Sequence, residues 1–106
     1  MPTQPNVSNS FQVFLDQASK HSQAWMSAVQ GLDKACALDK KTGELAYLAV
    51  LAVQRLESGV PFHVKMAKQA GASRAEVISA ILVGLPAAGQ IVLQVLPAAI
   101  SAYDEE

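Results

Sequence analysis

Between Val77 and Tyr103 the sequence carries no charged residue, so a fold must keep most of this stretch away from water. The stretch is long enough to cross a bilayer. Gly84, Pro86 and Pro97 interrupt it, however, and Pro86 divides it into two helix-length segments. This pattern is typical of two buried helices that pack together, and we therefore expect no membrane-spanning segment.

Apolar residues recur at helical spacing along the first third of the chain, as far as Leu32. Ser10 precedes this pattern and is the expected N-cap. Gly31 is the point where we expect the helix to end or loosen. A first helix is therefore predicted from about Phe11 to Leu32.

Residues that typically begin or end helices divide the rest of the chain into further helices. Asp39 can cap a strongly apolar helix, and Ser73 with Glu76 forms a capping box for a later one. Gly71 suits a left-handed residue that closes the helix before it. The four further helices are expected over residues 40–57, from Pro61 to about 70, from about 74 to Leu85, and from about Ala88 to Tyr103 with a kink or split at Pro97.

No stretch alternates apolar and polar residues for long enough to predict a strand, so the expected fold class is all-α with about five helices. The length of 106 residues suits a single domain over residues 1–106. At 51% hydrophobic and 16% charged residues, the chain has more apolar surface than a small monomer easily buries. We therefore expect a homo-oligomer.

Charge and cysteine content exclude several classes of function. The net charge of −1, without a basic stripe, argues against nucleic-acid binding. A single cysteine, Cys36, permits neither an intrachain disulfide nor two-cysteine redox catalysis. The start, Met1–Ser10, is polar and lacks the apolar run of a secretory signal, so we expect a cytoplasmic protein.

Glu44 and His63 are the candidate catalytic residues, because burying either costs free energy unless it has a partner or a task. Each also has a structural interpretation. A carboxylate near a helix N-terminus is favoured by the helix dipole, and an imidazole packed between helices can bond to a carbonyl. If they are functional, an imidazole that accepts and donates protons suits general acid–base chemistry.

The other candidate residues have less support. His21 lies among polar neighbours and is expected on the surface. His21, Glu44 and His63 lack the paired spacing of metal ligands, so no metal site and no cofactor are expected. Cys36 has no base beside it in the sequence, and we interpret it as a buried, inert thiol.

Three segments together resemble the carboxymuconolactone decarboxylase family, which includes the alkylhydroperoxidase-D-like proteins. They are Leu38–Leu45 (LDKKTGEL), Arg55–Val64 (RLESGVPFHV), and the four-residue steps from His63 to Ala67 and Gly71. The resemblance covers about residues 38–89 and depends on combined spacing, above all the position of His63 nineteen residues after Glu44. It implies a compact orthogonal helical bundle that assembles as a trimer or hexamer.

In the peroxidase branch of that family a C-x-x-C pair precedes the histidine. The resemblance places Leu56 and Gly59 at those two positions, whereas Glu44 and His63 keep the acid and histidine positions. Leucine and glycine supply no thiol, so dithiol peroxidase activity is not expected. A weaker alternative is a peroxiredoxin-like antioxidant that uses Cys36 alone.

The decarboxylase branch is similar in lacking the cysteine pair, and its reaction needs acid–base groups. The resemblance then implies His63 as proton donor or acceptor and Glu44 as the group that orients it or holds substrate. The expected pocket lies near the start of the helix at Pro61, and its expected lining residues are Tyr47, Leu56, Gly59 and Phe62. The ligand would be a small organic acid or lactone.

Charge near the motif separates two hypotheses. The only cations that we identify near it are Arg55, Lys65 and Lys68, which are few for a tricarboxylic substrate. An apolar pocket suggests a smaller or less charged ligand. The alternative to an acid–base lyase is therefore a non-catalytic oligomeric relative that binds a ligand or acts as a scaffold.

Overall fold

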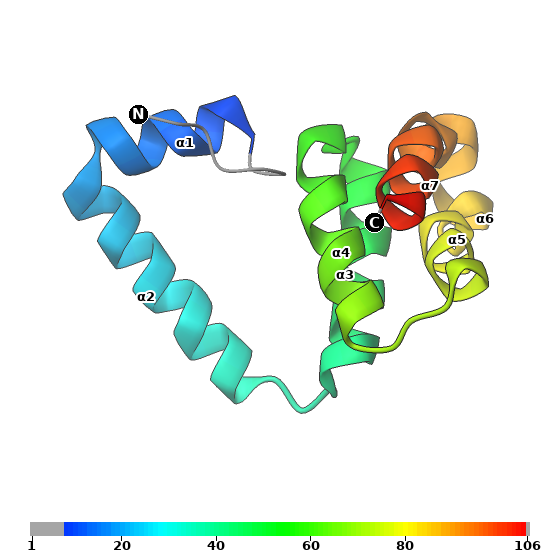
Figure 1. Ribbon diagram of the computed structural model, residues 1–106, viewed down its shortest axis with the longest axis horizontal. Coiled ribbons are helices and arrows are strands. Elements are labelled where there is room, and N and C mark those ends of the chain that lie inside the picture. The colour runs from blue at the N-terminus through cyan, green and yellow to red at the C-terminus, as the bar shows by residue number, and fades with distance from the viewer. Residues whose placement is uncertain (1–7, 106) are drawn as a thin grey trace. The chain divides into compact units, whose positions relative to one another are not determined.

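The computed structural model describes residues 8–105, and these residues form helices without any strand (Figure 1). The predicted all-α class is confirmed. Most of the polar start Met1–Ser10 lies outside the described residues. The chain divides into two compact units, Met1–Leu38 and Asp39–Glu106, so the single domain over residues 1–106 stays a prediction.

The first unit contains α1 (Asn9–Gln17) and α2 (Ser19–Ala35), where one helix had been predicted. The cap is Ser8, not Ser10, since the Ser8 hydroxyl accepts the Phe11 N–H at 3.1 Å. The break falls at Ala18, whose backbone leaves the helical region with φ −135° and ψ 58°. The prediction that the helix ends or loosens at Gly31 is wrong, because a single glycine weakens a helix by only about 1 kcal/mol.

The second unit begins with α3 (Lys40–Gln54), which Asp39 caps as predicted by accepting the Thr42 N–H at 2.8 Å. The helix ends three residues before the predicted Glu57. Arg55 takes a left-handed conformation with φ 58°, and the Leu56 N–H bonds to the Leu51 carbonyl at 3.0 Å. These bonds satisfy the last carbonyls of the helix in the way a C-terminal glycine usually does.

After α3 come the 3₁₀ helix η1 (Glu57–Gly59) and α4 (Val60–Gln69). Gly71 closes α4 as predicted, with φ 99°. The predicted capping box at the start of α5 (Arg74–Leu82) is present, with Glu76 N–H to Ser73 Oγ at 3.0 Å and Ser73 N–H to Glu76 Oε1 at 2.8 Å.

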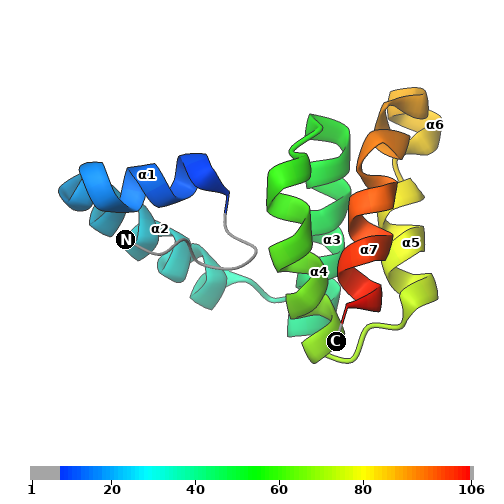
Figure 2. The same ribbon diagram turned by 45° about the horizontal axis from the view of Figure 1, so that its top comes forward.

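The segment Arg74–Asp104 is long and apolar enough to cross a membrane by length and composition, with a mean hydropathy of 1.8. The structure divides it into α5, α6 (Leu85–Ala88), the 3₁₀ helix η2 (Gly89–Val95) and α7 (Leu96–Asp104). Pro97 lies in the first turn of α7, so the predicted last helix is split rather than kinked. α7 folds back against α5 (Figure 2).

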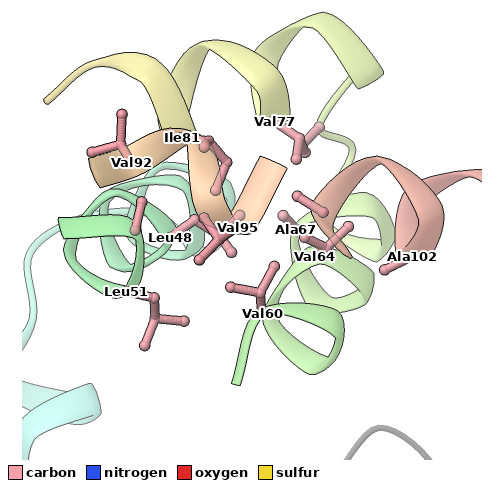
Figure 3. Packing of buried hydrophobic residues seen from close by; sticks show 13 residues of the cluster. Leu48, Leu51, Val60, Val64, Ala67, Val77, Ile81, Val92, Val95 and Ala102 are labelled. Atoms are coloured by element: carbon pink, nitrogen blue, oxygen red, sulfur yellow. The ribbon is translucent and has the colours of Figure 1, made fainter. Parts of the chain in front are cut away.

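The hydrophobic core lies entirely in the second unit, among α3, α4, α5, η2 and α7 (Figure 3). The largest side chains that are fully buried there are Leu48, Ile81, Val60, Val64, Val77, Val92 and Val95. In α3 the core side chains are Leu48, Leu51 and Ala52. The core therefore fixes α3 against α4, the two helices that carry Glu44 and His63.

Candidate active site

Glu44 and His63 are in direct contact. The distance from His63 Nδ1 to Glu44 Oε2 is 2.9 Å. Both side chains are largely buried, since 14% of the Glu44 side chain and 26% of the His63 side chain are exposed. Glu44 lies in the second turn of α3 and His63 in the first turn of α4, so the contact exists because α3 and α4 pack together.

The charge state of Glu44 sets the direction of this hydrogen bond. Burial raises the pKa of the Glu44 carboxyl, but the hydrogen bond and charge interaction with His63, together with Lys40, lower it more, so that the pKa lies below its ordinary value of 4.5. An ionised carboxylate only accepts hydrogen bonds. His63 Nδ1–H therefore donates to Glu44 Oε2, and the second ring nitrogen, Nε2, stays free to exchange a proton with a ligand.

Two aromatic rings contact the His63 imidazole. The Tyr47 ring lies 4.5 Å from it between centroids, at an interplanar angle of 48°. The Phe62 ring meets it edge-on, with centroids 5.1 Å apart. Tyr47 and Phe62 are 48% and 42% exposed, so both offer apolar surface beside the imidazole. Of the predicted lining residues, these two are placed at the dyad.

The other two predicted lining residues lie at η1, before the start of α4. Leu56 is 51% exposed. Gly59 faces Leu51, whose methyl groups would lie 3.7 Å from a Cβ at that position. The two positions that carry thiols in the peroxidase branch are thus occupied by an exposed leucine and a packed glycine, so this part of the chain offers His63 no thiol.

Lys40 belongs to the site, although it was not among the site residues predicted from the sequence. Its Nζ lies 3.5 Å from Glu44 Oε1, the carboxylate oxygen that His63 does not use. The signal was present in the sequence, because residues four apart on a helix are neighbours. Lys65 and Lys68, which were identified instead, bond to Glu105 and to the Tyr103 carbonyl at 2.7 Å each.

An open groove of about 710 Å³ lies on another face of α3, between α3 and α5. Its floor is formed by small and apolar side chains such as Leu45, Ala49 and Ala80, and Lys41 pairs with Glu76 at its edge at 2.9 Å. Neither Glu44 nor His63 lines it. The groove is therefore separate from the dyad, whose side chains are partly exposed to solvent.

The remaining candidates lie in the first unit. His21 is exposed, as predicted. Cys36 is exposed as well, so its interpretation as a buried thiol is wrong: it follows the end of α2 in the short connection before α3. Among residues 8–105, no group of three or more histidine, cysteine, aspartate or glutamate side chains could hold a metal ion.

This small all-helical protein thus holds a carboxylate–imidazole pair between two packed helices, without a thiol at the preceding turn. The chain belongs to the carboxymuconolactone decarboxylase family, whose match extends over residues 20–101. No curated protein and no solved structure matches the chain. The family match includes both Glu44 and His63, and it confirms the resemblance seen in the sequence.

Proposed function

We propose that this protein is an acid–base lyase of the decarboxylase type, which acts on a small organic acid or lactone through His63 and Glu44. One observation carries the proposal: the 2.9 Å contact between His63 Nδ1 and Glu44 Oε2, which leaves Nε2 for a ligand. A dyad of this kind can hold a proton at Nε2 or transfer it to a ligand.

In such a reaction the bond from the substrate to carbon dioxide breaks, and its electron pair stays on the substrate carbon, conjugated with a carbonyl group. His63 Nε2–H, in the imidazolium form, then gives its proton to that carbon, and the electron pair of the C–H bond is the one released by decarboxylation. Glu44 stabilises the imidazolium before the transfer and keeps Nε2 turned toward the ligand.

The test is carbon dioxide release from carboxylated lactones and small unsaturated acids by wild type and by His63→Ala. We expect the substitution to abolish turnover while leaving the helical circular dichroism spectrum unchanged. His21→Ala is the matched control, since His21 is exposed and lies in the other unit. Turnover that survives in His63→Ala would exclude the dyad as the catalytic group.

A non-catalytic ligand-binding or scaffold protein is the second candidate, and the open position of the dyad favours it. In that case no acid or lactone is turned over, and His63→Ala changes only stability or assembly. The third candidate, a peroxidase that uses Cys36, predicts loss of the free thiol at low peroxide. Unchanged thiol titration after peroxide treatment would exclude it.

We also propose that the subunits assemble into a homo-oligomer, a trimer or hexamer. Large apolar side chains are exposed on the second unit, among them Val50 at 54%, Val83 at 66% and Leu93 at 41%. Only 17% of the most apolar window of Arg74–Asp104 is buried within the subunit. Surface of this kind is typical of a subunit interface.

Light scattering of the purified protein measures this directly. We expect the mass of a trimer or hexamer, and a smaller mass for Val83→Glu, whose charge would be buried against a second copy. Val83 and Lys41 both line the groove between α3 and α5. Lys41→Glu is therefore a useful comparison, because it changes the charge at the polar edge of that groove. A wild-type protein that is monomeric, or that binds to lipid vesicles, would contradict the proposal.

A further inference from the structure

Lys40 is the cation that lies beside the dyad. Lys40 Nζ lies 3.5 Å from Glu44 Oε1, and 55% of its side chain is exposed. An ammonium group has three donors, and a contact at this distance with one oxygen leaves donors directed toward solvent. Lys40 can therefore receive one further anionic group while it remains beside Glu44.

No second cation among residues 39–105 is available beside Glu44 and His63. The other lysines and arginines of residues 39–105 are paired elsewhere or are remote: Lys41 with Glu76, Lys65 with Glu105, Lys68 with the Tyr103 carbonyl, Arg74 with Asp104, and Arg55 at the end of α3. Arg55 is about 16 Å along the helix axis from Glu44, given a rise of about 1.5 Å per residue.

Lys40, Glu44 and Tyr47 follow one another at four- and three-residue steps, so they form a row on one face of α3. His63 and Phe62 meet this row from α4. A ligand that reaches His63 thus finds a cation at one end of the row and two half-exposed aromatic rings at the other. Rings placed beside a polar group in this way bind flat apolar bodies.

We propose that the dyad binds a small planar ligand that carries a single carboxylate, with its flat body against Tyr47 and Phe62 and its carboxylate beside Lys40. The proposal rests on the proposed function only for the identity of the site. Each additional carboxylate on the ligand would face Glu44 without a counter-charge, which weakens binding about fivefold for a separation of about 4 Å in water.

The experiment uses four probes that share one benzene ring: benzamide, benzoate, isophthalate and benzene-1,3,5-tricarboxylate. Dissociation constants are measured from the imidazole signals of His63 in NMR spectra, and the signals of His21 serve as an internal reference. We expect benzoate to bind most tightly, and the tricarboxylate to bind most weakly of the three anions. His63 signals should move and His21 signals should not.

Two matched lysine variants test the role of Lys40. Lys40→Met should weaken benzoate binding about fivefold and leave benzamide binding unchanged, since only benzoate carries the charge. Lys41→Met, one residue along α3 and paired with Glu76, should change neither. Tyr47→Ala should weaken the binding of both benzoate and benzamide, because it removes the ring and leaves the charge of Lys40 in place.

Tighter binding of the tricarboxylate than of benzoate, or benzoate binding that Lys40→Met leaves unchanged, would overturn the inference. Binding and turnover are read separately, so the two proposals can fail independently. If no probe binds but lyase turnover depends on His63, the ligand class is wrong and the function stands. If benzoate binds as expected and no acid or lactone is turned over, the ligand site stands and the lyase function fails.

Discussion

Replacing Glu44 with Gln separates the charge of the dyad from its hydrogen bond. The amide oxygen can still accept the His63 Nδ1–H, but the negative charge is lost. In wild type the folded pKa of Glu44 lies below its ordinary value of 4.5, because the interactions with His63 and Lys40 outweigh burial. The ionised carboxylate therefore stabilises the fold above about pH 4.5, and this stabilisation disappears as the pH falls through the folded pKa.

The size of the effect follows from the type of hydrogen bond. Bonds to charged groups contribute about 1.5–3 kcal/mol and neutral ones about 0.5–1.5 kcal/mol, so loss of the charge costs about 1 kcal/mol. We take the lower end of this difference because 26% of the His63 side chain is exposed to solvent. For a domain of about 60–100 residues, 1 kcal/mol lowers Tm by roughly 4–8 °C.

Thermal unfolding followed by circular dichroism provides the assay, at about pH 7 and again at an acidic pH below the folded pKa of Glu44, where the carboxyl is protonated in both the folded and the unfolded chain. We expect Glu44→Gln to be less stable than wild type at the higher pH and to match it closely at the lower. Glu57→Gln, an exposed carboxylate in η1, is the control and should show no such pH-dependent difference. Equal destabilisation at both pH values would refute the reasoning, since it would show that the charge is not the cause.

Three further substitutions test the core packing, a helix cap and a hydrogen bond in the unit that contains the dyad. Ile81→Ala removes a fully buried side chain from the core and should lower the free energy of unfolding by about 2–5 kcal/mol in chemical denaturation. Ser73→Ala removes the hydroxyl that accepts the Glu76 N–H at 3.0 Å and should cost about 0.5–2 kcal/mol, measured in the same way. Tyr103→Phe removes the hydroxyl that donates to the Ala72 carbonyl at 2.8 Å, and we expect a loss of about 1 kcal/mol, seen as a lower Tm with unchanged benzoate binding.

Helix boundaries were predictable from the sequence where a local capping residue marks them. Asp39 and Ser73 cap their helices through side-chain bonds that depend only on residues within three positions, so local sequence determines them. The end of α3 at Arg55 had no comparable signal, because arginine rarely adopts a left-handed backbone. The break at Ala18 likewise involves neither glycine nor proline, so no local sequence signal predicts it.

The site was predictable in its residues but not in its geometry. Glu44 and His63 were identified from the cost of burying them and from a family resemblance. Their helices are joined through η1, however, and the 2.9 Å contact depends on how α3 packs on α4. Lys40 could have been identified, since its four-residue step to Glu44 is local. The exposure of Cys36 could not, because a single cysteine in a short connection has no periodic pattern to place it.

The two faces of α3 have different roles, which explains how this chain keeps the dyad without thiols. Leu48 and Ala52 on one side of the helix are fully buried in the core, whereas Lys40 and Glu44 belong to the face that meets His63. The core thus fixes the helices that carry the carboxylate and the imidazole. The absence of cysteine at Leu56 and Gly59 removes dithiol chemistry from that turn, and the contact between Glu44 and His63 forms without it.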